Sequence, residues 1–165
     1  MLIVDTFARD RLPPPEQWPR LHFDLPELRY PERMNCATVL LDDAVAEGHG
    51  DRPVILTEAG AISYRQLLAR ANRIANVLRD LGAVPGNRVL LRGFNGPELI
   101  AAWLAVVKTG AIAVTTMPML RIPELKAIIE QSRPSIALCD QRLLTELRAA
   151  VEVTGAPVTI LGWGD

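Results

Sequence analysis

Four short apolar runs, separated by segments long enough to form helices, shape the second half of the chain. They are Val89–Arg92, Ile112–Thr116, Ser135–Cys139 and Val158–Leu161. The runs are largely apolar instead of alternating with polar residues, which is typical of parallel strands covered on both faces. Strands joined by helices require crossover connections. The pattern therefore predicts an α/β fold of three layers, with a mostly parallel sheet and helices on both of its faces.

Start and stop signals bound the helices of the first half. Asn35 is suited to cap a helix that ends at Gly48. Ser63 and Gln66 have the spacing of a capping box, in which each side chain accepts a hydrogen bond from the other residue's backbone. Gly82 ends the helix that follows this box. The apolar stripe of that helix comprises Leu67, Ala71, Ile74, Leu78 and Leu81.

Three further helices are predicted between the four strands. The first has Pro97 in its opening turn and ends at Gly110. The second runs from about Pro123 to Ser132, and Asp140 can cap the third.

The helix 97–109 is apolar almost all round, so it should be covered on most sides. The chain also ends directly after a predicted strand, and no signal in it completes the sheet. We therefore expect an incomplete domain. Its apolar face, from helix 97–109 or the edge of strand 158–161, is expected to drive self-association.

Residues 1–34 differ in composition from the rest, because six of the 13 prolines lie there. Proline fixes its own φ and disfavours helix in the residue before it, so this segment is predicted to be an extended arm. A proline-rich ligand segment is the less favoured interpretation. The arm also carries aromatic side chains that are expected to anchor it on the domain, namely Phe7, Trp18, Phe23 and Tyr30.

Composition and charge exclude several classes of function. With 18 basic and 19 acidic residues the formal net charge is −1, so no broad field favours nucleic acid or anionic lipid. The longest apolar run, 99–107, is about half of a membrane span, and the first residues lack a secretory signal pattern. Cys36 and Cys139 belong to no CxxC pattern, which fits free thiols in a reducing compartment. We therefore expect a cytoplasmic protein with neither nucleic acid nor membrane as a partner.

Ligands of open parallel sheets bind at the carboxyl ends of the strands. The loops that follow those ends are Gly93–Gly96, Met117–Arg121 and Asp140-Gln141. The Gly93–Gly96 loop could offer backbone N–H groups to a phosphate, but it matches no phosphate-binding motif. A plain turn in which Asn95 caps the next helix is the preferred interpretation. Thr115 and Thr116 are similarly interpreted as an ordinary strand exit in preference to a pocket wall.

The remaining polar residues form no catalytic constellation. His22 lies in the arm and His49 in a Gly-His-Gly turn, while Asp42-Asp43 is expected to be solvated. Lys108 is placed at a helix carboxyl end, where positive charge suits the helix dipole, and Lys126 on an exposed helix face. No nucleophile elbow and no Ser/His/Asp or Cys/His set is present. We therefore predict no catalytic residue, no cofactor-binding residue and no metal ligand within this chain.

Several stretches in register nevertheless resemble the adenylate-forming, or AMP-forming, acyl-CoA synthetases. They are Asp51–Leu56 with Ile62–Leu67, Ala71–Ala75 and Leu78–Gly82; Val84–Val89; Leu104–Ala111 leading to Met117-Pro118; Pro123–Lys126; and Ser135–Asp140. Within the family, Leu25–Pro31 and Met34–Ala37 are most similar to the benzoate and 2-aminobenzoate CoA ligase branch. The resemblance covers essentially the whole chain.

The resemblance implies an N-terminal fragment of an aryl-CoA ligase that works in two steps. A carboxylate attacks the α-phosphate of ATP in the presence of Mg²⁺, and the CoA thiol then displaces AMP from the acyl-adenylate. Donors, cations and a lysine must hold the reacting groups, and the family supplies them from later segments. Residues 1–34 are thus expected to be an arm, and residues 35–165 a partial N-terminal α/β domain, truncated before the ATP-phosphate loop.

The fragment is accordingly expected to be inactive alone and to bind no cofactor itself. ATP, Mg²⁺, CoA and a small aromatic carboxylate are the ligands implied for its parent. The alternative is a stand-alone, non-catalytic α/β module for nucleotide binding or regulation. A response-regulator-like module is less favoured, because no acidic cluster lies at the strand ends.

Overall fold

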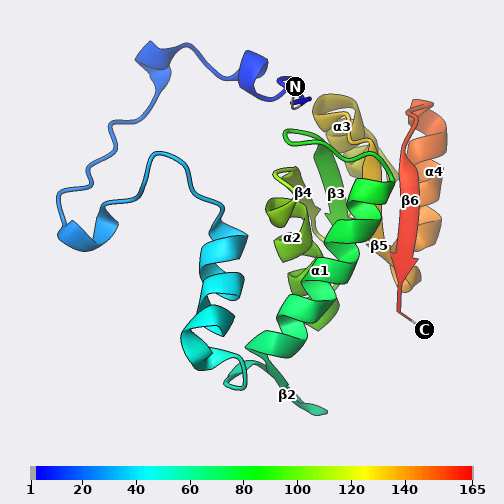
Figure 1. Cartoon of the computed structure of the whole chain (residues 1–165). Helices are drawn as coiled ribbons and strands as arrows, with labels where there is room; N and C mark the ends of the chain where they lie inside the picture. Colours follow the sequence, from blue (N-terminus) through cyan, green and yellow to red (C-terminus); the bar gives the residue numbers. More distant parts are fainter. Residues whose placement is uncertain (1–2, 165) are drawn as a thin grey trace.

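A four-stranded parallel sheet forms the centre of the molecule (Figure 1). The computed structural model describes residues 3–164. The sheet has the order β4-β3-β5-β6, and all neighbouring strands are parallel. Its strands are β3 (Arg88–Arg92), β4 (Ile112–Thr116), β5 (Ile136–Asp140) and β6 (Thr159–Trp163). Every residue of β3 and β5 is buried, as predicted for strands covered on both faces.

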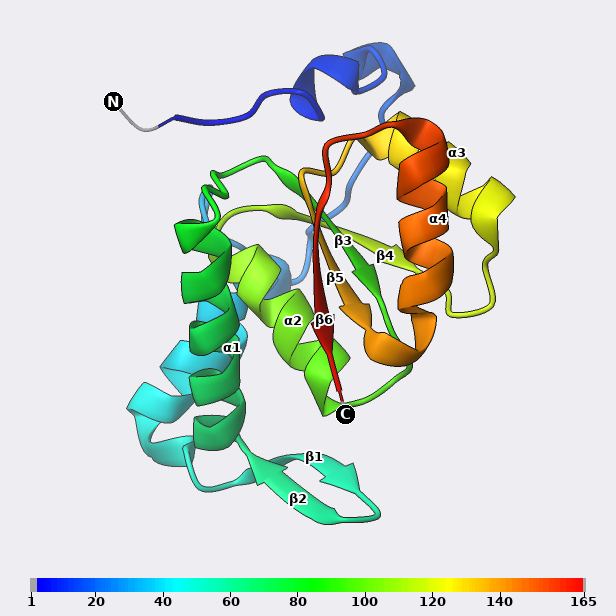
Figure 2. The ribbon, with the colours of Figure 1, turned by 90° about the vertical axis from the view of Figure 1, so that its right-hand side faces the viewer.

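Two helices cover each face of the sheet, so the fold is the predicted three-layer α/β arrangement (Figure 2). The helices α1 (Tyr64–Asp80) and α2 (Pro97–Lys108) lie on one face, and α3 (Ile122–Ser132) and α4 (Leu144–Thr154) on the other. Alternate residues of β3 supply the two cores. Val89 and Leu91 pack with α1 and α2, whereas Leu90 packs with α3 and α4.

The capping box of α1 is present as predicted. The Ser63 side chain accepts from the backbone N–H of Gln66, and the Gln66 side chain accepts from that of Ser63. The predicted stripe is wrong only at its last residue. Leu81 lies beyond the final turn and is 43% exposed, while Gly82 ends the helix with a φ of +82°.

The helical segment before α1 is of π type, η4 (Thr38–Asp43) followed by η5 (Val45–His49). Asn35 caps it as predicted, because its side-chain oxygen accepts from the backbone N–H groups of Ala37 and Thr38. The segment packs against α2 through a shared apolar cluster. This packing corrects one prediction: Asp42 is not simply solvated, since both of its carboxylate oxygens accept from Lys108 Nζ, at 2.5 and 2.7 Å.

A small antiparallel hairpin connects the π-type segment to α1. It pairs β1 (Pro53–Thr57) with β2 (Gly60–Ser63) and stays separate from the main sheet. The second strand has no clear sequence signal, because Gly60–Ser63 is short and not strongly apolar. Helix α2 is covered on most sides, as expected, since α1, the sheet and η4 all pack on it.

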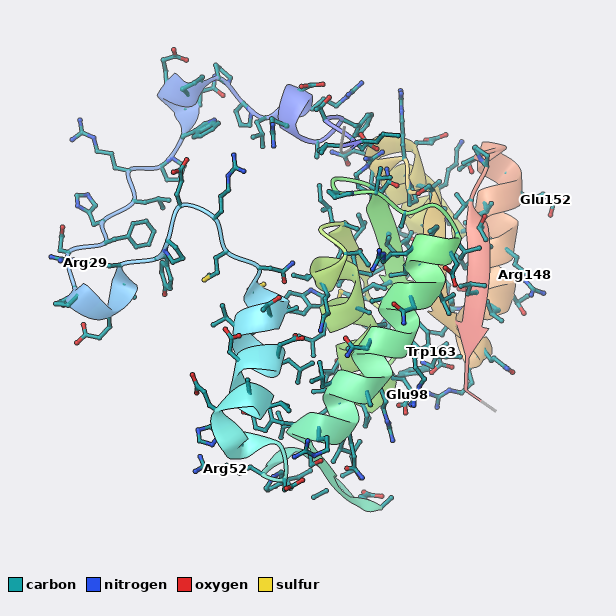
Figure 3. The ribbon with its side chains drawn as sticks, viewed as in Figure 1. Arg29, Arg52, Glu98, Arg148, Glu152 and Trp163 are labelled. Carbon is teal, nitrogen blue, oxygen red and sulfur yellow. The ribbon has the colours of Figure 1, made fainter. Side chains whose placement is uncertain are left out.

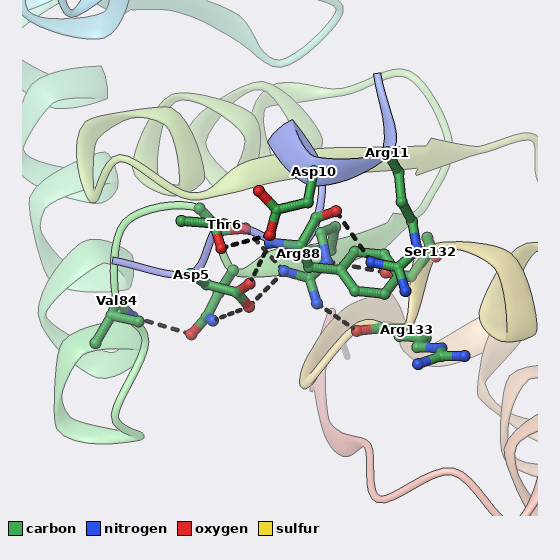
Figure 4. Close-up of polar contacts among 11 residues, drawn as sticks. Asp5, Thr6, Asp10, Arg11, Val84, Arg88, Ser132 and Arg133 are labelled. Carbon is green, nitrogen blue, oxygen red and sulfur yellow. Dashed lines mark hydrogen bonds and ion pairs between the residues drawn. The ribbon is translucent and has the colours of Figure 1, made fainter. Parts of the chain in front are cut away.

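The N-terminal segment docks at the amino edge of the sheet, opposite the strand ends that bind ligands in such folds (Figure 2). Asp5 accepts from Arg88 at 2.5 Å and from Asn87 at 2.9 Å, and the Asp5 backbone N–H donates to Pro85 O (Figure 4). Arg88 also lies 4.4 Å from the centre of the Phe7 ring. Residues 5–7 are therefore fixed to the domain.

The middle of the N-terminal segment runs away from the domain with three short 3₁₀ turns (Figure 1). They are η1 (Arg9–Arg11), η2 (Pro15–Gln17) and η3 (Pro26–Leu28). Of the four aromatic anchors predicted, only Phe7 lies against the domain. Trp18, Phe23 and Tyr30 are each at least half exposed, and Phe23 contacts Tyr30 edge to face. Proline keeps this stretch extended, so these rings are held off the domain surface.

Candidate functional site at the carboxyl edge of the sheet

The parallel strands bring three loops to one edge of the sheet. The loops follow β3, β4 and β5, and they are the three that the sequence singled out. Two arginines, Arg92 and Arg142, connect them to one another and to α4. The three loops are therefore held together by polar contacts and are not independent turns.

Arg92 is the last residue of β3 and is completely buried. Its guanidinium donates to the carbonyl oxygens of Met117, Pro118 and Leu120, at 2.9, 3.0 and 2.8 Å. The loop after β4 is thus held by three charge-assisted hydrogen bonds from the neighbouring strand.

Glu146 of α4 balances the buried charge of Arg92. Its carboxylate lies 3.6 Å from Arg92 and also pairs with Arg121 at the start of α3. Arg92 Nε finds no hydrogen-bond partner among residues 3–164. The sequence does not single out this arginine, because an arginine at a strand end ordinarily indicates that the strand leaves the core there.

Asp140 ends β5 and organises the third loop. Its carboxylate accepts from the backbone N–H of Arg142 and caps η6 (Gln141–Leu143), the turn that leads into α4. The side chain of Arg142 donates to the same carboxylate, at 2.9 and 2.6 Å, and this holds the pKa of Asp140 below its ordinary value. Asp140 was predicted to cap the helix after β5, and it does so through this short turn.

The loop after β3 joins the same surface through Phe94. The guanidinium of Arg142 lies 4.4 Å from the centre of the Phe94 ring, which is 44% exposed. The predicted cap of α2 is wrong: the helix begins after Gly96, and within residues 3–164 no side chain, Asn95 included, caps it. The backbone at Gly93 passes so close to Trp163 of β6 that a Cβ there would lie 2.4 Å from the indole.

A groove of about 540 Å³ lies beside this edge, between α1, α2 and the end of β6. Its walls are mainly apolar, although charged side chains are among the lining residues. Figure 3 shows two of its residues, Glu98 and Trp163, near each other, and Glu98 pairs with Arg70 at 3.2 Å. The lining includes Arg70, Arg73, Ile74, Val77, Glu98 and Trp163.

The remaining predicted candidates do not join a common site. Thr116 is buried and donates to Leu91 O, which makes it part of the sheet, while Thr115 is exposed. Lys126 pairs with Glu130 along α3. Burial raises the pKa of Cys139 to about 11, so this thiol is a poor nucleophile. Among residues 3–164 there is no group of three or more His, Cys, Asp or Glu side chains that could hold a metal ion.

The polar contacts of Arg92 and Arg142 therefore fix the loops at this edge of the sheet. Residues 3–164 contain no helix that is long and apolar enough to cross a membrane.

Comparison with known proteins identifies the family of this chain. Residues 42–162 match the family model described as AMP-binding enzyme. A 3-hydroxybenzoate/4-hydroxybenzoate–CoA ligase of Thauera aromatica is 32% identical over 118 residues, which cover 72% of this chain and 23% of that protein. A benzoate–CoA ligase of the same organism is 29% identical over 120 residues, with the same two coverages.

A solved structure agrees in fold. The crystal structure of an anthranilate CoA ligase in complex with anthranoyl-AMP matches with a TM-score of 0.75 at 24% identity, over 82% of this chain and 26% of that one. The chain spans about a quarter of the length of the curated relatives it matches. Because the family model covers well over half of the chain, this protein belongs to the AMP-binding enzyme family.

Proposed function

We propose that this chain is the N-terminal part of an ATP-dependent aryl-CoA ligase that acts on benzoate or 2-aminobenzoate. The observation that carries the proposal is the family match over residues 42–162, together with similar proteins that are CoA ligases of benzoate and hydroxybenzoates. The 2-aminobenzoate option comes from the resemblance of segments 25–31 and 34–37 to that branch.

The proposed reaction forms an acyl-adenylate and then a thioester. The carboxylate oxygen attacks the α-phosphate of ATP and pyrophosphate leaves; the CoA sulfur then attacks the acyl carbon and AMP leaves. Within residues 3–164, no three or more His, Cys, Asp or Glu side chains gather as a metal site. In the proposed ligase, this chain contributes the sheet and its carboxyl-edge loops, and other segments hold ATP and Mg²⁺.

The test begins with the reading frame downstream of the Asp165 codon. A frame that continues into a Ser/Thr/Gly-rich stretch with a lysine allows the longer protein to be expressed and assayed. We expect carboxylate-dependent ATP–pyrophosphate exchange with benzoate and 2-aminobenzoate, and little exchange with acetate. The 165-residue chain alone is expected to give none.

Two results would contradict the proposal. A stop codon directly after Asp165 would favour the alternative, a stand-alone module, which direct binding of AMP or ATP to the chain would then test. Exchange that is faster with acetate than with any aromatic acid would remove the aryl substrate class.

A further inference from the structure

The strand β3 carries a buried arginine at each end, and both bind backbone carbonyl groups. Arg88, at the amino edge, donates to the carbonyl oxygens of Gly86, Ser132 and Arg133 and to Asp5 (Figure 4). Arg92, at the carboxyl edge, donates to those of Met117, Pro118 and Leu120. The two side chains are four residues apart on one strand and therefore point to the same face of the sheet.

A fully buried guanidinium is unfavourable unless it is well paired. Arg92 is 0% exposed, its nearest carboxylate is 3.6 Å away, and its Nε finds no partner within residues 3–164. An apolar side chain at this position would avoid the desolvation of a charge. Such a side chain would not provide the donors that bind three backbone carbonyl groups of the loop after β4.

That loop lies at the edge where open parallel sheets bind their ligands. It presents Met117 and Met119 outward, with 60% and 75% of their surfaces exposed. Methionine side chains adapt readily to an apolar partner. The position of the loop backbone therefore determines where the side chains of Met117 and Met119 lie.

We propose that Arg92 is a positioning residue that holds the loop 117–120, and with it Met117 and Met119, in place for the ligase reaction. The proposal rests on the proposed function for its catalytic consequence. The placement of the loop by Arg92 is tested separately, in the chain itself.

The first experiment measures hydrogen exchange of backbone amides, by mass spectrometry, in this chain and in three variants. Arg92→Met removes the donors at similar length, Arg92→Lys keeps the charge, and Arg88→Met is the matched control on the same strand. We expect Arg92→Met to raise exchange in peptides covering 117–124 at least tenfold and Arg92→Lys to restore part of the protection. Arg88→Met should raise exchange near residues 5 and 133 and leave 117–124 unchanged.

The second experiment compares the same variants in the longer ligase. Arg92→Met is expected to raise the KM of at least one substrate tenfold or more with a smaller change in kcat, and Arg88→Met to leave both near the unmodified values. If Arg92→Met fails to fold, Arg92→Lys is assayed in its place, with at least a threefold rise in KM expected.

Unchanged exchange in 117–124, or a rise spread evenly over the chain, would overturn the placement of the loop by Arg92. A localised rise without any change in KM would overturn its role in the reaction. Lack of activity in the unmodified longer protein would instead contradict the proposed function. The hydrogen-exchange measurement would still test whether Arg92 holds the loop.

Discussion

At the scale of single residues, Asp5 connects the N-terminal segment to the domain through Arg88 and Asn87. Its hydrogen bond with Arg88 is the main cause that lowers its pKa, and the backbone N–H of Phe7 and the side chain of Asn87 lower it further. Arg88 is only 10% exposed at its side chain. A carboxylate held ionised in this way stabilises the folded chain at neutral pH.

Asp5→Asn is therefore expected to lower the free energy of unfolding by about 1–3 kcal/mol at pH 7. Since the pKa of Asp5 is lowered in the folded chain, its contribution is present above the ordinary aspartate range and is lost as the pH falls through the folded pKa. Urea unfolding across pH should show the difference from the unmodified chain shrinking below about pH 4. Asp10→Asn is the control, because the Asp10 carboxylate is exposed and accepts a hydrogen bond from the hydroxyl of exposed Thr6. A difference that stays constant with pH would contradict this account.

The two cysteines should differ in reactivity for physical reasons. Cys139 is completely buried in β5, and burial raises the pKa of its thiol to about 11, whereas Cys36 is partly exposed. We expect iodoacetamide at pH 8 to label Cys36 in the folded chain and Cys139 only after unfolding in urea. Mass spectrometry of tryptic peptides measures both. Equal labelling rates in the folded chain would show that β5 opens far more readily than its burial implies.

At the scale of elements, the start of α1 depends on the capping box. Ser63→Ala removes the acceptor for the Gln66 backbone N–H and is expected to lower the free energy of unfolding by about 0.5–2 kcal/mol. Ser63→Asp keeps an acceptor at the same position and should retain most of the stability. Thermal or urea unfolding followed by circular dichroism measures both variants. If Ser63→Ala and Ser63→Asp lowered the free energy of unfolding equally, the cap would be unimportant for α1.

The elements that sequence predicted well are those whose signals are local. The runs that became β3 to β6, the box at Ser63 and the cap at Asn35 depend on neighbours within a few residues, so the pattern alone locates them. The strand β2 was missed because its four residues become a strand only by pairing with β1. Asn95 was wrongly expected to cap α2, because a favourable residue type does not ensure the geometry of a cap.

The candidate site was predictable in place but not in composition. Because parallel strands end at one edge, the three loops could be named from the sequence. The roles of Arg92 and Glu146 could not be predicted from the sequence. The hydrogen bond from Arg92 to Leu120 spans 28 residues of sequence, and the contact with Glu146 depends on the packing of α4 against the sheet. Asp42 likewise meets Lys108 across 66 positions of sequence. Such long-range ion pairs leave no periodic signal.

At the scale of the whole molecule, an open apolar surface remains beside the edge strand. β6 pairs with β5 on one side, and no strand of residues 3–164 pairs with its other side. The adjoining groove is lined by Ile74, Val77, Leu161 and Trp163 among others, and Val77 is 45% exposed. Unpaired strand edges and contiguous apolar surface both favour association with another chain.

We therefore expect the purified 165-residue chain to self-associate through this surface, with a second copy of the chain as the partner. Sedimentation velocity should give a mass that rises with protein concentration, and a hydrophobic dye should bind. Val77→Lys places a charge in the groove and should shift the chain toward monomer. Leu56→Lys is the matched control, because Leu56 is 79% exposed but lies on the separate hairpin, so it should leave association unchanged. A monomer at all protein concentrations that binds no dye would contradict this expectation. It would mean that neither the β6 edge nor the groove mediates association, because the chain itself shields their apolar residues from solvent.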